Sequence, residues 1–205
     1  MMIELTSTPI ILMVILGVAG MIIPVINVLR RERGSSTFYG AIAFGALLLA
    51  LGFVIFQFYD DNLAPAAVFS EDVLADDGFG SFFAIAMLIV SIMTVAGSFN
   101  YMRKRSNPAI YFSLILLSSI GMVLIAFATD LVMLFVAWEL MSIPTYILAG
   151  FNKKNPSSNE AAIKYFLFGA LSSGIIIYGI SLAYGITGST NIGDVIYGFA
   201  NLSPD

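Results

Sequence analysis

The chain has 205 residues, of which 59% are hydrophobic and 11% are charged, and its formal net charge is −4. A soluble domain covers its surface with far more charge than this, so the composition excludes a soluble protein and indicates an integral membrane protein. The chain has neither cysteine nor histidine. Their absence excludes disulfides and thiolate metal or iron–sulfur sites, and it leaves haem and catalytic zinc without their usual ligands.

The apolar residues form long continuous runs and not the alternating pattern of a membrane β-barrel, so we expect the spans to be helices. About 20 apolar residues cross the hydrocarbon core of a bilayer. Six runs reach that length, at 8–30, 37–58, 81–102, 108–128, 131–151 and 161–186. The pattern therefore predicts an all-α membrane protein with six transmembrane helices. The residues before the first run include the acid Glu4 and no basic residue. We therefore expect this run to be a retained helix and not a secretory signal.

The basic residues predict the orientation of the chain in the membrane. Eight of the nine follow the first, third or fifth run: Arg30, Arg31, Arg33, Arg103, Lys104, Arg105, Lys153 and Lys154. Positively charged loops stay in the cytoplasm during insertion, so the amino terminus and the carboxyl-terminal tail are expected outside a plasma membrane. The acids of the other loops and tails agree with this orientation: Glu4, Asp60, Asp61, Glu71, Asp72, Asp76, Asp77, Asp130, Asp194 and Asp205.

The tail at 188–205 predicts one further, short helix. Asn191 is a suitable N-cap, and Asp194 follows in the first turn. Four apolar residues share one face, which predicts an amphipathic helix lying on the outer surface: Ile192, Val195, Ile196 and Phe199.

Glu139 is the most informative residue, because it lies near the middle of the fifth run. A charged side chain at the bilayer midplane costs roughly 2.5–3.5 kcal/mol on insertion scales. Burial favours the neutral acid, whereas a nearby cation favours the carboxylate, so an acid under both influences can take up and release protons. The alternative is a neutral acid that joins helices by a hydrogen bond.

The neighbours of Glu139 fit a proton-relay site. Pro144 has no backbone N–H, so the carbonyl of Leu140 loses its helical partner and a kink is expected there. Ser142 lies three residues from Glu139 on the same helical face, and Trp138 adds bulk beside it. The small residues of the sixth run, Ser172, Ser173 and Gly174, are expected to serve helix packing.

Lys164 is the second charge within the runs, near the predicted cytoplasmic end of the sixth. Three interpretations of Lys164 stay open. The amine can extend to the membrane interface, it can lie inside the bundle as a relay or counter-charge, or it can pair on the helix surface with Glu160 four residues earlier.

Two adjacent stretches resemble a known family: TDLVMLFVAWELMSIPTYILAGFNKKN at 129–155 and SNEAAIKYFLFGALSSGIIIYGISLAYGITGS at 158–189. They are similar to the antiporter-like membrane subunits of respiratory complex I, above all to subunit N. The resemblance is strong over 110–189 and extends to DDGFGSFF at 76–83.

The resemblance implies a fold of about fourteen helices with two inverted five-helix repeats, of which this chain matches the amino-terminal portion. It implies proton movement without redox chemistry or a bound cofactor in this chain. Glu139 matches the family's glutamate of the fifth helix, which couples to a lysine on the broken seventh helix. Lys164 matches the lysine of the sixth helix, nearer the cytoplasmic half-channel.

This chain stops after six runs, so the resemblance divides it into helices one to four at 1–128, an incomplete first half-channel at 129–187 and the outer segment at 188–205. The expected partners are lipid, other membrane-arm subunits and a polypeptide or continuation that supplies the later helices. No nucleic-acid patch is present. A fragment, a split gene and helices supplied by another chain all stay open.

Three functions remain possible. The first is a proton-translocating subunit of a redox-driven dehydrogenase with an NADH, ferredoxin or deazaflavin donor and a quinone or phenazine acceptor. The second is a subunit of a multi-subunit cation/proton antiporter, and the third is a structural membrane module without transport.

Overall fold

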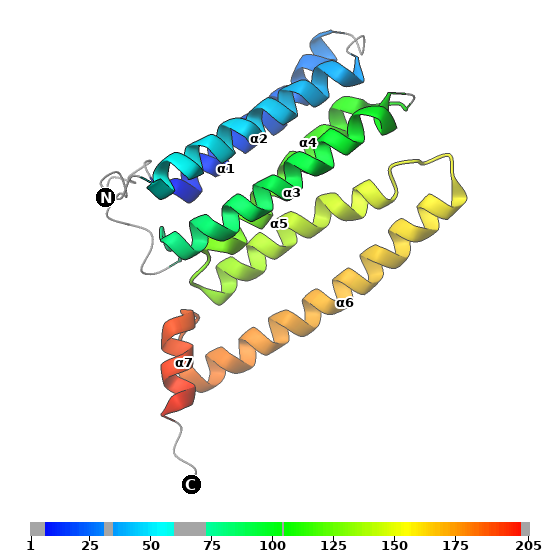
Figure 1. The fold of residues 1–205 in the computed structure, drawn as a ribbon. Helices are drawn as coiled ribbons and strands as arrows, with labels where there is room; N and C mark the ends of the chain where they lie inside the picture. The colour runs from blue at the N-terminus through cyan, green and yellow to red at the C-terminus, as the bar shows by residue number, and fades with distance from the viewer. Residues whose placement is uncertain (1–6, 31–34, 60–72, 104, 202–205) are drawn as a thin grey trace.

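The computed structural model describes residues 7–30, 35–59, 73–103 and 105–201. The helices of these segments are α1 (Thr8–Leu29), α2 (Ser36–Tyr59), α3 (Gly78–Met102), α4 (Pro108–Phe127), α5 (Leu131–Ala149), α6 (Pro156–Thr187) and α7 (Ile192–Ala200) (Figure 1). The first six are long and apolar enough to cross a membrane, which confirms the six predicted spans.

One helix boundary differs clearly from the prediction. Helix α6 begins at Pro156 and not near residue 161. Asn155 is its N-cap, and the Asn155 side chain accepts a hydrogen bond from the Ser157 backbone N–H. Pro156 occupies the first turn, where its missing N–H would have no helical partner. The polar start of α6 therefore folds as helix although it adds nothing to the apolar run.

Acidic side chains cap two other helices. The Asp77 carboxylate accepts a hydrogen bond from the Gly80 N–H at 2.7 Å and so begins α3. Asp130 accepts from the N–H groups of Val132 and Met133 and begins α5 directly after α4 ends. Such caps satisfy backbone donors that have no partner within the helix.

The six long helices, α1 to α6, run antiparallel to their chain neighbours (Figure 1), and α4 lies at the centre of the bundle. It packs against α1, α2, α3 and α5, and it contributes more buried residues than any other described helix. Helix α6 lies along the outer side of α5 and buries none of its own residues. The core is thus built from α1 to α5, and α6 is attached to it through α5.

Helices α4 and α5 touch backbone to backbone at Gly121. A Cβ atom at Gly121 would lie 2.3 Å from the Met141 amide nitrogen and 2.7 Å from the Ala137 carbonyl oxygen. Neither atom is at the end of a flexible side chain, so only glycine permits this crossing. Close approach through small residues is the usual way in which membrane helices associate.

The predicted short helix in the tail is present as α7. The Asn191 side chain caps it by accepting hydrogen bonds from Gly193 and Asp194. Two backbone hydrogen bonds tie its start to the α4–α5 turn, from Leu131 N–H to the Thr190 carbonyl and from Ile192 N–H to the Thr129 carbonyl. Val195 is buried. The chain after Asn201 lies outside the described residues.

Replacing Gly121 by alanine should separate α4 from α5, because the new Cβ meets two backbone atoms that cannot move independently of their helix. We expect Gly121→Ala to lower the free energy of unfolding by about 1–3 kcal/mol, the usual range for overpacking. Thermal unfolding in detergent measures this loss. Gly45→Ala is the matched control, since a Cβ at Gly45 would meet nothing within 4 Å. Equal melting of the two variants would contradict the proposed crossing.

Candidate functional site

Glu139 lies at the interface of α5 and α6, about half-way along α5, and its side chain is half-buried. The hydroxyl of Ser173 on α6 donates a short hydrogen bond to the Glu139 carboxylate. The mid-span acid therefore does not face an empty apolar surface. It has a polar partner from the neighbouring helix, as a carboxyl group at this depth requires.

The register of the α5–α6 hairpin brings these two residues together. A Cβ at Gly150 would lie 2.7 Å from the Ala162 Cβ, and the rings of Tyr146 and Phe166 are 5.9 Å apart. These pairs, like Glu139 and Ser173, are placed symmetrically about Pro156 in the sequence. Two antiparallel helices with the same rise per residue keep such a register along their whole contact.

A second polar contact joins α5 and α6 between Glu139 and the connection of the hairpin. Thr145 and Tyr165 approach within hydrogen-bond distance, with 3.3 Å between their hydroxyl oxygens. The Tyr165 ring meets the Tyr146 ring edge to face at 4.9 Å. The Tyr146 ring packs directly against Gly169: a Cβ at Gly169 would lie 2.1 Å from the Tyr146 hydroxyl oxygen and would displace the ring.

The other side of α5 faces α4. The three residues predicted to support Glu139 differ in how far they are buried. Ser142 and Pro144 are buried, whereas Trp138 is exposed at the surface of the described chain. Ser118 of α4 donates a hydrogen bond at 3.0 Å to the carbonyl of Met141, one residue beyond the carbonyl that Pro144 leaves without a partner. Helix α5 continues through Pro144. The kink and a role for Trp138 stay predictions.

Lys164 and Glu139 are not brought together. The Lys164 amine forms an ion pair with Glu160 at 2.5 Å, and both side chains are about two-thirds exposed, at 65% and 64%. Nine residues of helix separate Lys164 from Ser173, which corresponds to a rise of about 14 Å. The surface pair that was one of three alternatives is present, and an exposed pair of this type contributes little to stability.

Ser173 is the residue of this site that sequence reasoning missed, because it was assigned to helix packing. Its neighbour Ser172 shows how similar the two look in sequence. Ser172 is exposed and bonds only back to the Phe168 carbonyl of its own helix. The hairpin register about Pro156, once known, would have singled out Ser173.

Most charges of the described loops and helix ends separate to the two ends of the bundle, and the exception is Glu160, an acid near the start of α6 that pairs with Lys164. Arg30, Arg103, Arg105, Lys153 and Lys154 lie where α1, α3 and α5 end, and this is called the basic end below. Asp76, Asp77, Asp130 and Asp194 lie at the opposite, acidic end. Several charges used for the orientation lie outside the described residues: Glu4, Arg31, Arg33, Asp60, Asp61, Glu71, Asp72, Lys104 and Asp205.

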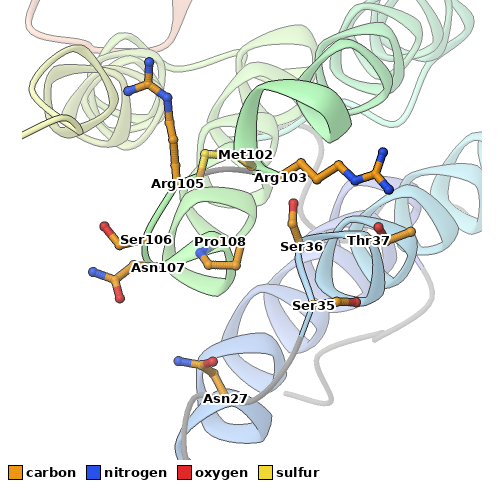
Figure 2. A pocket seen from close by; sticks show the side chains of 10 residues that line it. All are labelled: Asn27, Ser35, Ser36, Thr37, Met102, Arg103, Arg105, Ser106, Asn107 and Pro108. Atoms are coloured by element: carbon orange, nitrogen blue, oxygen red, sulfur yellow. The ribbon is translucent and has the colours of Figure 1, made fainter.

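The basic end carries a cavity of about 540 Å³ between the end of α1, the start of α2 and the α3–α4 connection. Figure 2 shows Arg103, Arg105, Ser36 and Asn107 among the side chains that line it. Asn27 at its edge accepts a hydrogen bond from the Tyr39 hydroxyl at 2.8 Å. This cavity is far from Glu139, which lies in mid-span.

Comparison with known proteins supports the resemblance seen in the sequence. Residues 128–203 match the family model described as "NADH:quinone oxidoreductase/Mrp antiporter, TM". This segment, which contains Glu139, Ser173 and Lys164, is similar to that family. The match covers the α5–α6 hairpin and α7.

The similarity to subunit N extends over most of the chain. The chain is 38% identical over 185 residues to NADH-quinone oxidoreductase subunit N of Trichlorobacter lovleyi, covering 89% of this chain and 36% of that protein. It is 38% identical over 125 residues to F(420)H(2) dehydrogenase subunit N of Methanosarcina mazei, covering 61% of this chain and 25% of that protein. The chain thus spans a little over a third of the length of the first of these relatives.

Solved structures show the same fold. A chain of respiratory complex I from Thermus thermophilus superposes with a TM-score of 0.72 at 28% identity, over 89% of this chain and 38% of that one. A chain of an archaeal membrane-bound sulfane sulfur reductase gives a TM-score of 0.76 at 22% identity, over 92% and 39%. The expectation that this chain matches part of a longer antiporter-like fold is confirmed.

Removing the Ser173 hydroxyl should change the environment of Glu139 without unfolding the hairpin. We expect Ser173→Ala to shift the infrared carboxyl band of Glu139, because a carboxyl group that loses a hydrogen-bond donor vibrates at a different frequency. The band is assigned by its loss in Glu139→Gln. Ser172→Ala is the matched control and should leave the band in place, since Ser172 bonds only to its own helix. A band that does not respond to Ser173→Ala would show that the two side chains do not meet.

Proposed function

We propose that this chain is a proton-translocating membrane-arm subunit of a complex I-like, redox-driven dehydrogenase. The observation that carries the proposal is the mid-span Glu139 with its hydrogen bond to Ser173, in a segment that matches the transmembrane family model. The donor class is NADH, ferredoxin or deazaflavin, and the acceptor is a quinone or a phenazine. The similarity to subunits N of two dehydrogenases supports this assignment.

In this proposal Glu139 takes up and releases the proton, and Ser173 holds its carboxyl group in place. A serine hydroxyl both donates and accepts, so Ser173 stays bonded in either protonation state of the acid. Thr145 and Tyr165 place hydroxyl groups between Glu139 and the basic end along the same seam. A proton moving between Glu139 and that end would pass these groups, with Lys164 beside Tyr165.

Transport against a membrane potential needs an energy source outside this chain. Moving one charge across 100 mV costs about 2.3 kcal/mol, which a redox reaction supplies. The chain has no cysteine or histidine to hold a redox metal centre. We infer that the other subunits of the complex perform the electron transfer, and that later helices of the antiporter-like fold complete the half-channel around Glu139.

Glu139→Gln should lower the number of protons moved per electron while the complex still assembles, because glutamine keeps the size and hydrogen-bonding capacity of the side chain and removes its titration. Proton uptake and electron transfer in sealed vesicles measure this ratio. Glu160→Gln is the matched control, since Glu160 is an exposed acid near the start of α6. An unchanged ratio in Glu139→Gln would remove the proposal and favour a structural module.

The same vesicles test the relay role of Lys164. If Lys164 acts only through its surface pair with Glu160, Lys164→Gln and Glu160→Gln will give the same number of protons moved per electron. If Lys164 is a relay, only Lys164→Gln will lower the proton ratio.

The family description supports one alternative, a subunit of a multi-subunit cation/proton antiporter, because it names both kinds of protein. The two functions differ in what drives transport. Sodium-dependent proton exchange in vesicles without an electron donor would favour the antiporter, and its absence would favour the redox-driven complex.

We further propose that the basic end faces the cytoplasm of a plasma membrane and the acidic end faces outside. The natural chain has no cysteine, so single cysteines can be placed without background. The variant Asp194→Cys should react with a membrane-impermeant maleimide in intact cells, and Lys153→Cys should react only after lysis. The reverse pattern would invert the orientation.

A further inference from the structure

A second cavity lies at the basic end, between the α3–α4 connection and the α5–α6 connection, and it has a volume of about 980 Å³. It is separate from the Glu139 site, which lies in the middle of the span. Its wall contains three cations, Arg105, Lys153 and Lys154, which come from two connections far apart in the sequence. Among the described residues that line it, none is an aspartate or a glutamate.

The cations are held in a defined setting. The Arg105 guanidinium lies 4.0 Å above the centre of the Tyr101 ring, and Tyr101 also lines the cavity. The first turn of α4 opens on the same space through Asn107 and Ile110. Asn107 makes no side-chain cap, so its side chain does not satisfy the amides of that turn. A helix amino terminus adds partial positive charge to a site that is already basic.

The deeper wall is apolar. Ile110 and Ile147 line the cavity and are 46% and 50% exposed, and they belong to the membrane-spanning helices α4 and α5. A tyrosine at the end of a span is typical of the headgroup region of a bilayer. The cavity thus combines a cationic rim at headgroup depth with an aliphatic wall that leads towards the membrane core.

We propose that this cavity binds one anionic phospholipid. The headgroup phosphate lies between Arg105, Lys153 and Lys154, and an acyl chain lies against Ile110 and Ile147. Basic cavities between membrane helices bind anionic headgroups in this way. The phosphate alone could also come from a free phosphate ester, but such a ligand makes no use of the isoleucine wall. The site couples the α3–α4 and α5–α6 connections through a lipid and is independent of whether Glu139 moves protons.

Native mass spectrometry of the purified full-length protein in detergent tests the proposal, with phosphatidylglycerol and phosphatidylcholine as probes of matched acyl chains. We expect tighter binding of phosphatidylglycerol. Arg105→Gln should weaken it about fivefold, since one basic residue near an anionic surface contributes on that scale. Lys153→Gln with Lys154→Gln should weaken it further, and Arg105→Lys should restore part of the loss.

Arg30→Gln is the matched control. Arg30 is also at the basic end and lies 4.3 Å above an aromatic ring, that of Phe38, but it does not line this cavity. An equal loss in Arg30→Gln and Arg105→Gln, or equal binding of the two lipids, would overturn the proposal. Displacement of the lipid by glycerol 3-phosphate at a similar concentration would show a free-phosphate site and overturn the assignment to lipid.

Discussion

The hydrogen bond between Glu139 and Ser173 depends on the register in which α5 and α6 pack, and the short connection between these helices sets that register. A shift of one residue would turn Ser173 away from the carboxyl group by about 100° around α6. The contacts at Gly150 and Gly169 oppose such a shift, because each glycine accepts a neighbouring side chain that a Cβ would displace. The site is therefore specified by glycines as much as by its polar residues.

The sequence was sufficient to predict the spans, because a bilayer imposes its own thickness on every apolar run. Each predicted span corresponds to a helix, and the tail helix began at the expected cap, Asn191. The beginning of α6 was not predicted. Its first turns, from Pro156 to Glu160, are polar and carry no apolar run, and only the cap at Asn155 marks the true boundary.

The candidate site was predicted in part. Glu139 stands out because an acid within an apolar run is costly and therefore rare. Its partner does not stand out, because residues 172 and 173 are both serine and differ only in the direction in which their side chains point from α6. The position of Lys164 was left open for a similar reason. A residue four positions from Glu160 is compatible with a surface pair and with a buried amine, and only the packing of α6 separates the two.

The crossing at Gly121 has a mechanical consequence for the neighbouring seam. The main chains of α4 and α5 are in direct contact there, so α5 cannot move closer to the core. Helix α6 differs, since it is anchored to the bundle by α5 on one side and by the α7 tether at one end. Glu139 is thus carried by the helix that touches the core backbone to backbone, whereas Ser173 is carried by a helix that the described chain holds only through α5 and α7.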